Sequence, residues 1–169
     1  IFNGDFEQGN VGFTSAATYT PGTLGVWPTY DILPNASVDN IDYAACPDHT
    51  TQSGNMMAVQ PPLSEGFTVW CQTVNVDPNT NYDLSFWVIR LYIYGGPFNN
   101  NTYKLFMNGK PVTSATPPGA ICKWSEIKAK WNSGSATSVE MCIEIVPTFP
   151  NVAHKALQGF GLDDISMRG

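Results

Sequence analysis

The chain is poor in charged residues, and in basic residues above all. Only 13% of its 169 residues are Asp, Glu, Lys or Arg, about half the share found in an average soluble protein. Eight Lys and Arg face 14 Asp and Glu, which gives a net charge of -6 and a pI near 4.6. Because nucleic-acid phosphates require a basic face, this composition excludes a nucleic-acid partner.

Long apolar runs and metal-binding cysteine pairs are also missing. No stretch approaches the length needed to cross a bilayer, so we expect no membrane insertion. No signal peptide is visible, and we expect any such segment to have been removed. None of the four cysteines forms a Cys-x-x-Cys pair, and neither His49 nor His154 stands at a zinc-ligand spacing from one, which argues against zinc.

Helical periodicity is absent as well, and short strand-like segments between turn residues take its place. Hydrophobic residues make up 43% of the chain, enough for a core. The hydrophobic pattern predicts strands at residues 1–8, 55–59, 67–76, 82–94, 103–107, 122–131, 139–146 and 159–167. Asn108-Gly109 is the strongest hairpin signal, and residues 9–55 predict mostly loop. We predict an all-β fold, a two-sheet antiparallel β-sandwich (jelly roll), in one domain over residues 1–169.

The cysteines form an even set, at positions 46, 71, 122 and 142. Four cysteines allow three pairings. We favour Cys46–Cys71 and Cys122–Cys142, because each pair joins neighbouring segments and the second can bridge a hairpin that turns near Asn132. The alternative is four buried free thiols in a reducing compartment. Disulfides would place the protein outside the cell, secreted or on the cell surface.

Acidic residues gather at the two ends of the chain. Asp5 and Glu7 lie in the first predicted strand, and Asp163 and Asp164 in the last. If these strands are neighbours, four carboxylates meet with no nearby His or Cys, and such an oxygen-only ligand set favours Ca²⁺. The alternative is that these are solvated carboxylates on edge strands, where they prevent aggregation.

Several short motifs can be read together: Asn3-Gly4-Asp5-Phe6-Glu7, Asp48-His49-Thr50, Gly54-Asn55-Met56-Met57, Val69-Trp70-Cys71-Gln72-Thr73-Val74, Trp131-Asn132-Ser133-Gly134 and Leu162-Asp163-Asp164-Ile165. This series resembles the galactose-binding-like jelly rolls, in particular the carbohydrate-binding modules of the family 4, 9 and 22 type. The resemblance runs over nearly the whole chain, although each motif is short. It implies neighbouring first and last strands with a structural Ca²⁺ between them. The ligands that it implies are Glu7 and Asp163 or Asp164, with Asn3 or Asp5 completing the shell.

Sugar binding requires flat aromatic faces beside polar side chains, and the chain supplies both. The alternation in residues 82–94 places Arg90, Tyr92 and Tyr94 on one face, an unusual set for a pure core. We therefore predict a ligand site formed by Trp27, Tyr30, Arg90, Tyr92, Tyr94 and Phe98. The alternative is that these tyrosines cap the core with their hydroxyls in water. We expect most of the tryptophans to be core, with Trp87 the least certain.

Catalytic signatures are weak. Glu140 and Glu144 share a strand face but look solvent-facing, and no Gly-x-Ser-x-Gly elbow is present. We expect His49 to hold its loop through hydrogen bonds rather than to act in catalysis. The sequence thus predicts a non-catalytic, secreted module that binds a poly- or oligosaccharide and carries structural calcium. The alternatives are an adhesion module for a surface or matrix protein and a small glycoside hydrolase.

Overall fold

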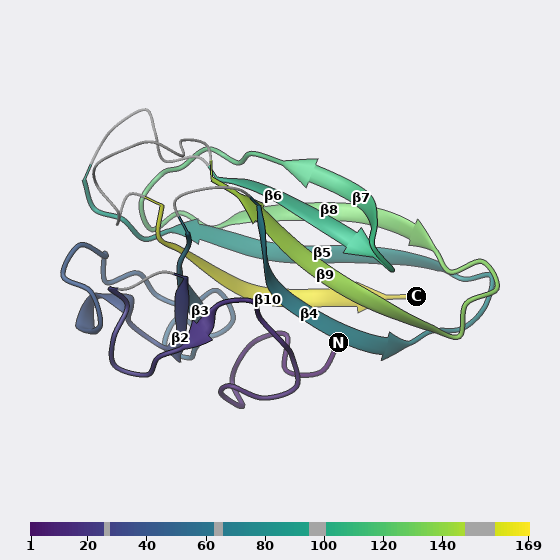
Figure 1. Ribbon diagram of the computed structural model, residues 1–169, viewed down its shortest axis with the longest axis horizontal. Helices are drawn as coiled ribbons and strands as arrows, with labels where there is room; N and C mark the ends of the chain where they lie inside the picture. The colour runs from purple at the N-terminus through teal and green to yellow at the C-terminus, as the bar shows by residue number, and fades with distance from the viewer. Residues whose placement is uncertain (26–27, 63–65, 95–100, 148–157) are drawn as a thin grey trace.

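The computed structural model describes residues 1–25, 28–62, 66–94, 101–147 and 158–169, whose strands form two sheets packed face to face (Figure 1). The six-stranded sheet has the order β1-β2-β3-β10-β5-β8 and the four-stranded sheet the order β4-β9-β6-β7. The strands are β1 (Thr18–Tyr19), β2 (Thr29–Leu33), β3 (Met56–Gln60), β4 (Phe67–Asn75), β5 (Asn81–Arg90), β6 (Thr102–Met107), β7 (Lys110–Ala115), β8 (Ser125–Asn132), β9 (Ser138–Val146) and β10 (Phe160–Arg168). A short 3-10 helix, η1 (Ala36–Val38), follows β2. The predicted all-β sandwich is confirmed.

The main core lies between the two sheets. Along β5, Leu84, Phe86 and Val88 point inward and are buried, while the alternate residues Ser85 and Trp87 are only partly buried on the outer face. The same alternation along β9 buries its odd-numbered residues from Val139 to Ile145. Every pairing between named strands is antiparallel except β1 with β2. The alternation of buried and exposed residues along each strand is what predicts a sandwich from the sequence.

A second apolar cluster lies apart from the main core. It gathers Leu24 and Tyr43 from the segment between β1 and β3 with Met56 of β3, Ile89 of β5 and Leu91, all buried. The long connection therefore folds over part of the sheet. This cover explains why the end of β5 is apolar on both faces.

The N-terminal residues do not form the predicted first strand. Residues 1–8 run through turns, with positive φ at Asn3 (51°) and Phe6 (55°), which a strand does not allow. The Asn3 side chain causes this, because its amide donates to the carbonyls of Gly9 and Val11 and its oxygen accepts from the N–H of Gln8. The two ends are nevertheless neighbours. The Ile165 N–H donates to the Gly4 carbonyl at 2.8 Å.

Both favoured disulfide pairings are wrong. The bonds join Cys46 to Cys122 and Cys71 to Cys142. Residues 122–131 and 139–146 were expected to form a hairpin, but β8 pairs with β5 in one sheet and β9 pairs with β4 and β6 in the other. The turn after β8 thus carries the chain across the sandwich, so Cys142 faces its register partner Cys71 on β4.

No helix in the described residues is long and apolar enough to cross a membrane.

Candidate functional site

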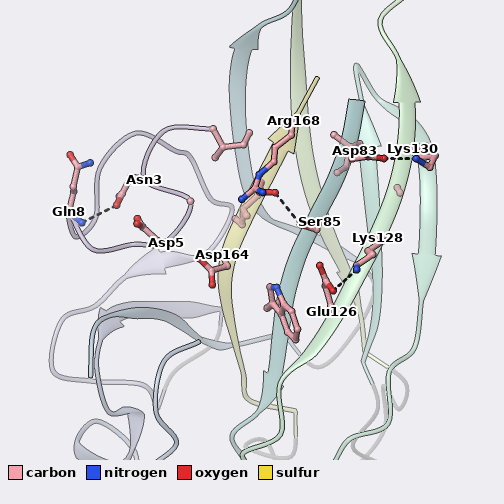
Figure 2. Close-up of a pocket in the computed structure, with 17 residues that line it drawn as sticks. Asn3, Asp5, Gln8, Asp83, Ser85, Glu126, Lys128, Lys130, Asp164 and Arg168 are labelled. Carbon is pink, nitrogen blue, oxygen red and sulfur yellow. Dashed lines mark hydrogen bonds and ion pairs between the residues drawn. The ribbon is translucent and has the colours of Figure 1, made fainter. Parts of the chain in front are cut away.

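A groove of about 960 Å³ lies on the outer face of the six-stranded sheet, over β5, β8 and β10. We call it the β5–β8–β10 groove. The turns of the N-terminal segment form one wall, where Asn3, Asp5 and Gln8 are seen in Figure 2. The strands supply the floor, because every second residue of a strand points away from the core.

Strand register arranges the floor in three rows across β10, β5 and β8. The first row holds Arg168, Asp83 and Lys130, since Asp83 is the register partner of both other residues. The second row holds Ser166, Ser85 and Lys128 in the same way. In the third row Trp87 pairs with Glu126 on β8 and with Asp163 on β10, where a bulge between Asp163 and Ser166 disturbs the register.

Polar contacts link neighbouring floor residues. Lys130 Nζ lies 2.7 Å from the Asp83 carboxylate, and Lys128 Nζ lies 2.8 Å from that of Glu126. The hydroxyls of Ser85 and Ser166 are 3.1 Å apart. These contacts are visible as dashed lines in Figure 2, where side chains from all three strands project into the groove. The groove therefore offers charged groups and hydroxyls to a polar ligand.

Trp87 adds an aromatic surface at one end of the groove. The His49 ring stacks on its indole with ring centroids 3.8 Å apart and an interplanar angle of 20°. Trp124 meets His49 edge-on at 5.7 Å, and its indole N–H donates to the Pro47 carbonyl. His49 is not a lining residue of the groove. It covers one face of the Trp87 indole and holds the ring in place.

Four carboxylates hold residues 48–55, which we call the 48–55 loop. Asp163 accepts the N–H groups of His49 at 2.8 Å and Thr50 at 3.3 Å. Asp48 accepts N–H groups within the loop, and Glu7 accepts the N–H of Asn55 at 2.8 Å. The expected loop-holding role of His49 is confirmed, because its Nδ1 also bonds the Asp164 carboxylate.

Asp163 is fully buried, and its environment disfavours the ionised form. Burial raises its pKa to about 7, against the lowering effect of the N–H donors from His49 and Asp164. The negative charge of the neighbouring Asp164 also raises the pKa of Asp163, by less than burial does. Asp164 itself has a positive φ of 47° beside the bulge. A positive charge near Asp163 would stabilise its ionised carboxylate and so lower its pKa.

The residues predicted to bind calcium lie in one region without forming a closed ligand shell. No three carboxylate or imidazole ligand atoms in the described part of the seam come within 4.8 Å of one another. Asp5 and Asp164 instead bond the Glu7 N–H and His49, respectively. A group that does meet this distance is Cys71, Glu140 and Cys142, but its cysteines are joined in a disulfide and offer no thiolate.

The predicted aromatic ligand site is brought together only in part. Arg90 donates to the carbonyls of Tyr92, Gly119 and Tyr94 at 3.1, 2.8 and 2.6 Å, so its guanidinium holds backbone. The Tyr92 and Tyr94 rings lie 5.4 Å apart, with Tyr92 buried and Tyr94 56% exposed. Tyr30 lies elsewhere, in the main core, where its hydroxyl donates to Asn10.

Two residues of that prediction, Trp27 and Phe98, fall outside the described residues. The groove, in turn, was not anticipated from sequence. Its charged residues on β8 alternate with Ile127 and Ala129, and that alternation alone marks a solvent-facing strand rather than a site. Asp83 and Arg168 carried no local signal at all. Only strand order places them beside Lys130.

No protein-family model and no curated protein matches the chain. Among solved structures, a family 16 carbohydrate-binding module is 13% identical with a TM-score of 0.55, covering 100% of this chain and 99% of that one. The CBM22-1 xylan-binding domain from Paenibacillus barcinonensis is 13% identical (TM-score 0.57; 97% of this chain, 90% of that one). A cyclase from Fischerella sp. TAU is also 13% identical (TM-score 0.62; 99% and 94%). These likenesses show that the chain shares its two-sheet β-sandwich fold with carbohydrate-binding modules and with a cyclase.

Proposed function

We propose that this protein is a non-catalytic module that binds a carbohydrate chain in the β5–β8–β10 groove. The carrying observation is the groove itself, in which Trp87 stands at the end of two rows of charged and hydroxyl side chains. An indole offers an apolar face to the C–H groups of a pyranose, and the polar rows offer partners for its hydroxyls. The shared fold with xylan- and sugar-binding domains supports this choice.

Truncation of Trp87 tests the proposal. We expect Trp87→Ala to lower affinity for a bound polysaccharide at least tenfold, measured by affinity electrophoresis and calorimetry over a glycan panel. Tyr94→Ala is the matched control, because Tyr94 is an exposed aromatic of the originally predicted site. Thermal melts of both variants check folding. Loss of binding in the Tyr94 variant alone would move the site to the Tyr92–Tyr94 region, and no binding to any sugar would refute the function.

The same panel tests the absence of catalysis. Glu126 and Asp164 both line the groove, so a hydrolase would draw on carboxylates of this kind. We expect bound oligosaccharides to be recovered intact after prolonged incubation. Release of shorter products that is lost in Glu126→Gln would establish a glycoside hydrolase instead.

A location outside the cell forms part of the proposal. Two disulfides are supported by the positions of the four cysteines, and such bonds persist in oxidising compartments. The surface fits the same setting, since few of its side chains are charged. We therefore propose a secreted or surface-attached protein that meets its glycan outside the cell.

We also propose a structural Ca²⁺ at the seam between the chain ends, with Glu7 and Asp163 as its carboxylates. The support is chemical: both are oxygen donors next to the 48–55 loop, and Asp163 is buried with a raised pKa. A bound cation would stabilise the ionised form of the buried Asp163 carboxylate. The chain's own residues then hold the loop through the N–H contacts described above.

Adhesion to a surface or matrix protein is a second candidate, favoured by an exposed apolar area. Ile41 and Tyr94 are 88% and 56% exposed, and the two segments are joined where the Ile93 N–H donates to the Asp42 carbonyl. Exposed apolar patches of this kind mark protein-contact sites. Capture of one matrix protein that persists in excess free sugar and is lost in Ile41→Ser would support adhesion.

A further inference from the structure

We propose that the β5–β8–β10 groove selects an acidic glycan and binds it in one direction. The anionic substituent would lie at the Arg168 end and an uncharged sugar ring at the Trp87 end. This inference rests on the carbohydrate-binding function proposed above, and it names the class of sugar. It follows from how strand register distributes charge along the groove.

The two ends of the groove differ in how their charged side chains are distributed. At one end Arg168 and Lys130 flank a single carboxylate, that of Asp83, because the three residues are register partners across β10, β5 and β8. At the other end Glu126 is the register partner of Trp87 on β8, and Asp164 follows Asp163, the register partner of Trp87 on β10. Figure 2 shows this separation, with Arg168, Asp83 and Lys130 together and Asp164 and Glu126 farther along the groove.

Arg168 is the cation best suited to hold an anionic group. Its side chain is exposed and lines the groove, and no ion pair of Arg168 is found among the described residues. Lys128 is less available to a ligand than Arg168, because its Nζ lies 2.8 Å from the Glu126 carboxylate. A guanidinium matches the planar geometry of a carboxylate with two parallel N–H donors, which a lysine does not provide.

Lys130 can assist Arg168 because its present contact is weak. The side chains of Lys130 and Asp83 are 86% and 72% exposed, and an exposed pair of this kind contributes little to stability. Lys130 can therefore turn toward a ligand carboxylate at small cost. The Ser85 and Ser166 hydroxyls, 3.1 Å apart in the next row, then face the sugar that follows.

The spacing suits a short oligosaccharide. Asp83 and Trp87 are four residues apart on β5, which corresponds to about 13 Å along a strand. An acidic sugar beside Arg168 and a neutral ring on Trp87 can thus belong to one chain. The whole protein carries a net charge of -6, so long-range attraction does not favour an anionic ligand. Selection must come from short-range contacts in the first row.

Matched probes test this inference. Xylobiose and xylotriose that each carry one glucuronic acid substituent are compared with their carboxyl-reduced, neutral forms by calorimetry. For wild type, we expect the acidic form to bind at least tenfold more tightly than its reduced form. Arg168→Gln should remove that preference, because the acidic form should lose at least tenfold more affinity than the reduced form. Lys110→Gln, which removes a charge from the other sheet, is the control and should keep the preference.

The outcomes separate this inference from the function that it refines. Equal binding of acidic and reduced forms, or binding of neutral xylan with neither acidic probe, overturns the acidic-glycan inference and leaves carbohydrate binding in place. An equal loss for both forms in Arg168→Gln assigns the residue to general sugar contact and also overturns it. If no sugar of any class binds, the proposed function fails as well.

Discussion

Removing the Cys46–Cys122 disulfide would test how the second apolar cluster is held against the sheet. Cys46 is buried in that cluster, in the connection that covers the sheet, and Cys122 precedes β8. Nearby backbone bonds tie the same cover down, among them Ala44 N–H to the Leu91 carbonyl at 2.7 Å. The variant Cys46→Ala/Cys122→Ala removes only the covalent link.

The expected loss follows from the length of chain that the bond closes. The two cysteines are 76 residues apart, and Cys71 and Cys142 are 71 apart. Loop-closure entropy grows only with the logarithm of this length, so each bond restricts the unfolded chain by about 4.5 kcal/mol at 25 °C. Cys71→Ala/Cys142→Ala is thus a matched control for global stability, and both variants should lose a similar amount in urea unfolding.

Local stability separates the two variants. Cys71 and Cys142 lie on strands that are already paired in register, whereas Cys46 anchors a cover made mostly of loop. Amide exchange at Ala44 and Ile93 should therefore accelerate only when the Cys46–Cys122 bond is lost. A loss below about 1 kcal/mol in that variant would contradict the entropy argument. Equal exchange in both variants would contradict the assigned role, and a peptide map with Cys46 joined to Cys71 would refute the pairing.

Two further predictions concern charge. Thorough chelation should lower the melting temperature, and added Ca²⁺ should restore it, with added Mg²⁺ as the control. A ligand that binds only the folded state stabilises it by about 2.7 kcal/mol at a hundredfold excess over Kd. A melting temperature that chelation leaves unchanged would contradict the calcium proposal. Burial and the neighbouring Asp31 raise the pKa of Asp39 to about 6, so the stability that its protonated form contributes is complete below about pH 4 and is lost as pH rises through 6. Asp39→Asn should therefore be more stable than wild type at pH 8, by about 1 kcal/mol after allowance for solvent screening, and equal at pH 4. Identical urea midpoints for the two proteins at both pH values would contradict this assignment.

Local pattern predicted much of the sheet structure. The hairpin at Asn108-Gly109 is present, with positive φ at both residues (48° and 72°), because few residues other than Asn and Gly adopt that conformation easily. The strands at 67–76 and 139–146 are found as β4 and β9, within a residue of their predicted bounds. Alternation is a property of the strand itself, so it can be read without knowing its neighbours.

Errors arose where a side chain overrode the local pattern or where pairing was non-local. The alternation in residues 1–8 indicated a strand, but the Asn3 amide bonds three backbone groups and turns the chain. Cys122 and Cys142 are close in sequence, yet Cys122 precedes β8 in one sheet and Cys142 lies on β9 in the other. Proximity along the chain was therefore a poor guide to the disulfides.

The sequence by itself determined the fold class and the hairpin, and its resemblance to a known family implied that the two ends are neighbours. These depend on composition, on the period of two along a strand and on short motifs. Only the tertiary structure decided which residues meet in the groove. Arg168, Asp83 and Lys130 come from three segments far apart in the chain. Their juxtaposition depends on strand order and register, which arise from packing of the whole sandwich rather than from any local stretch.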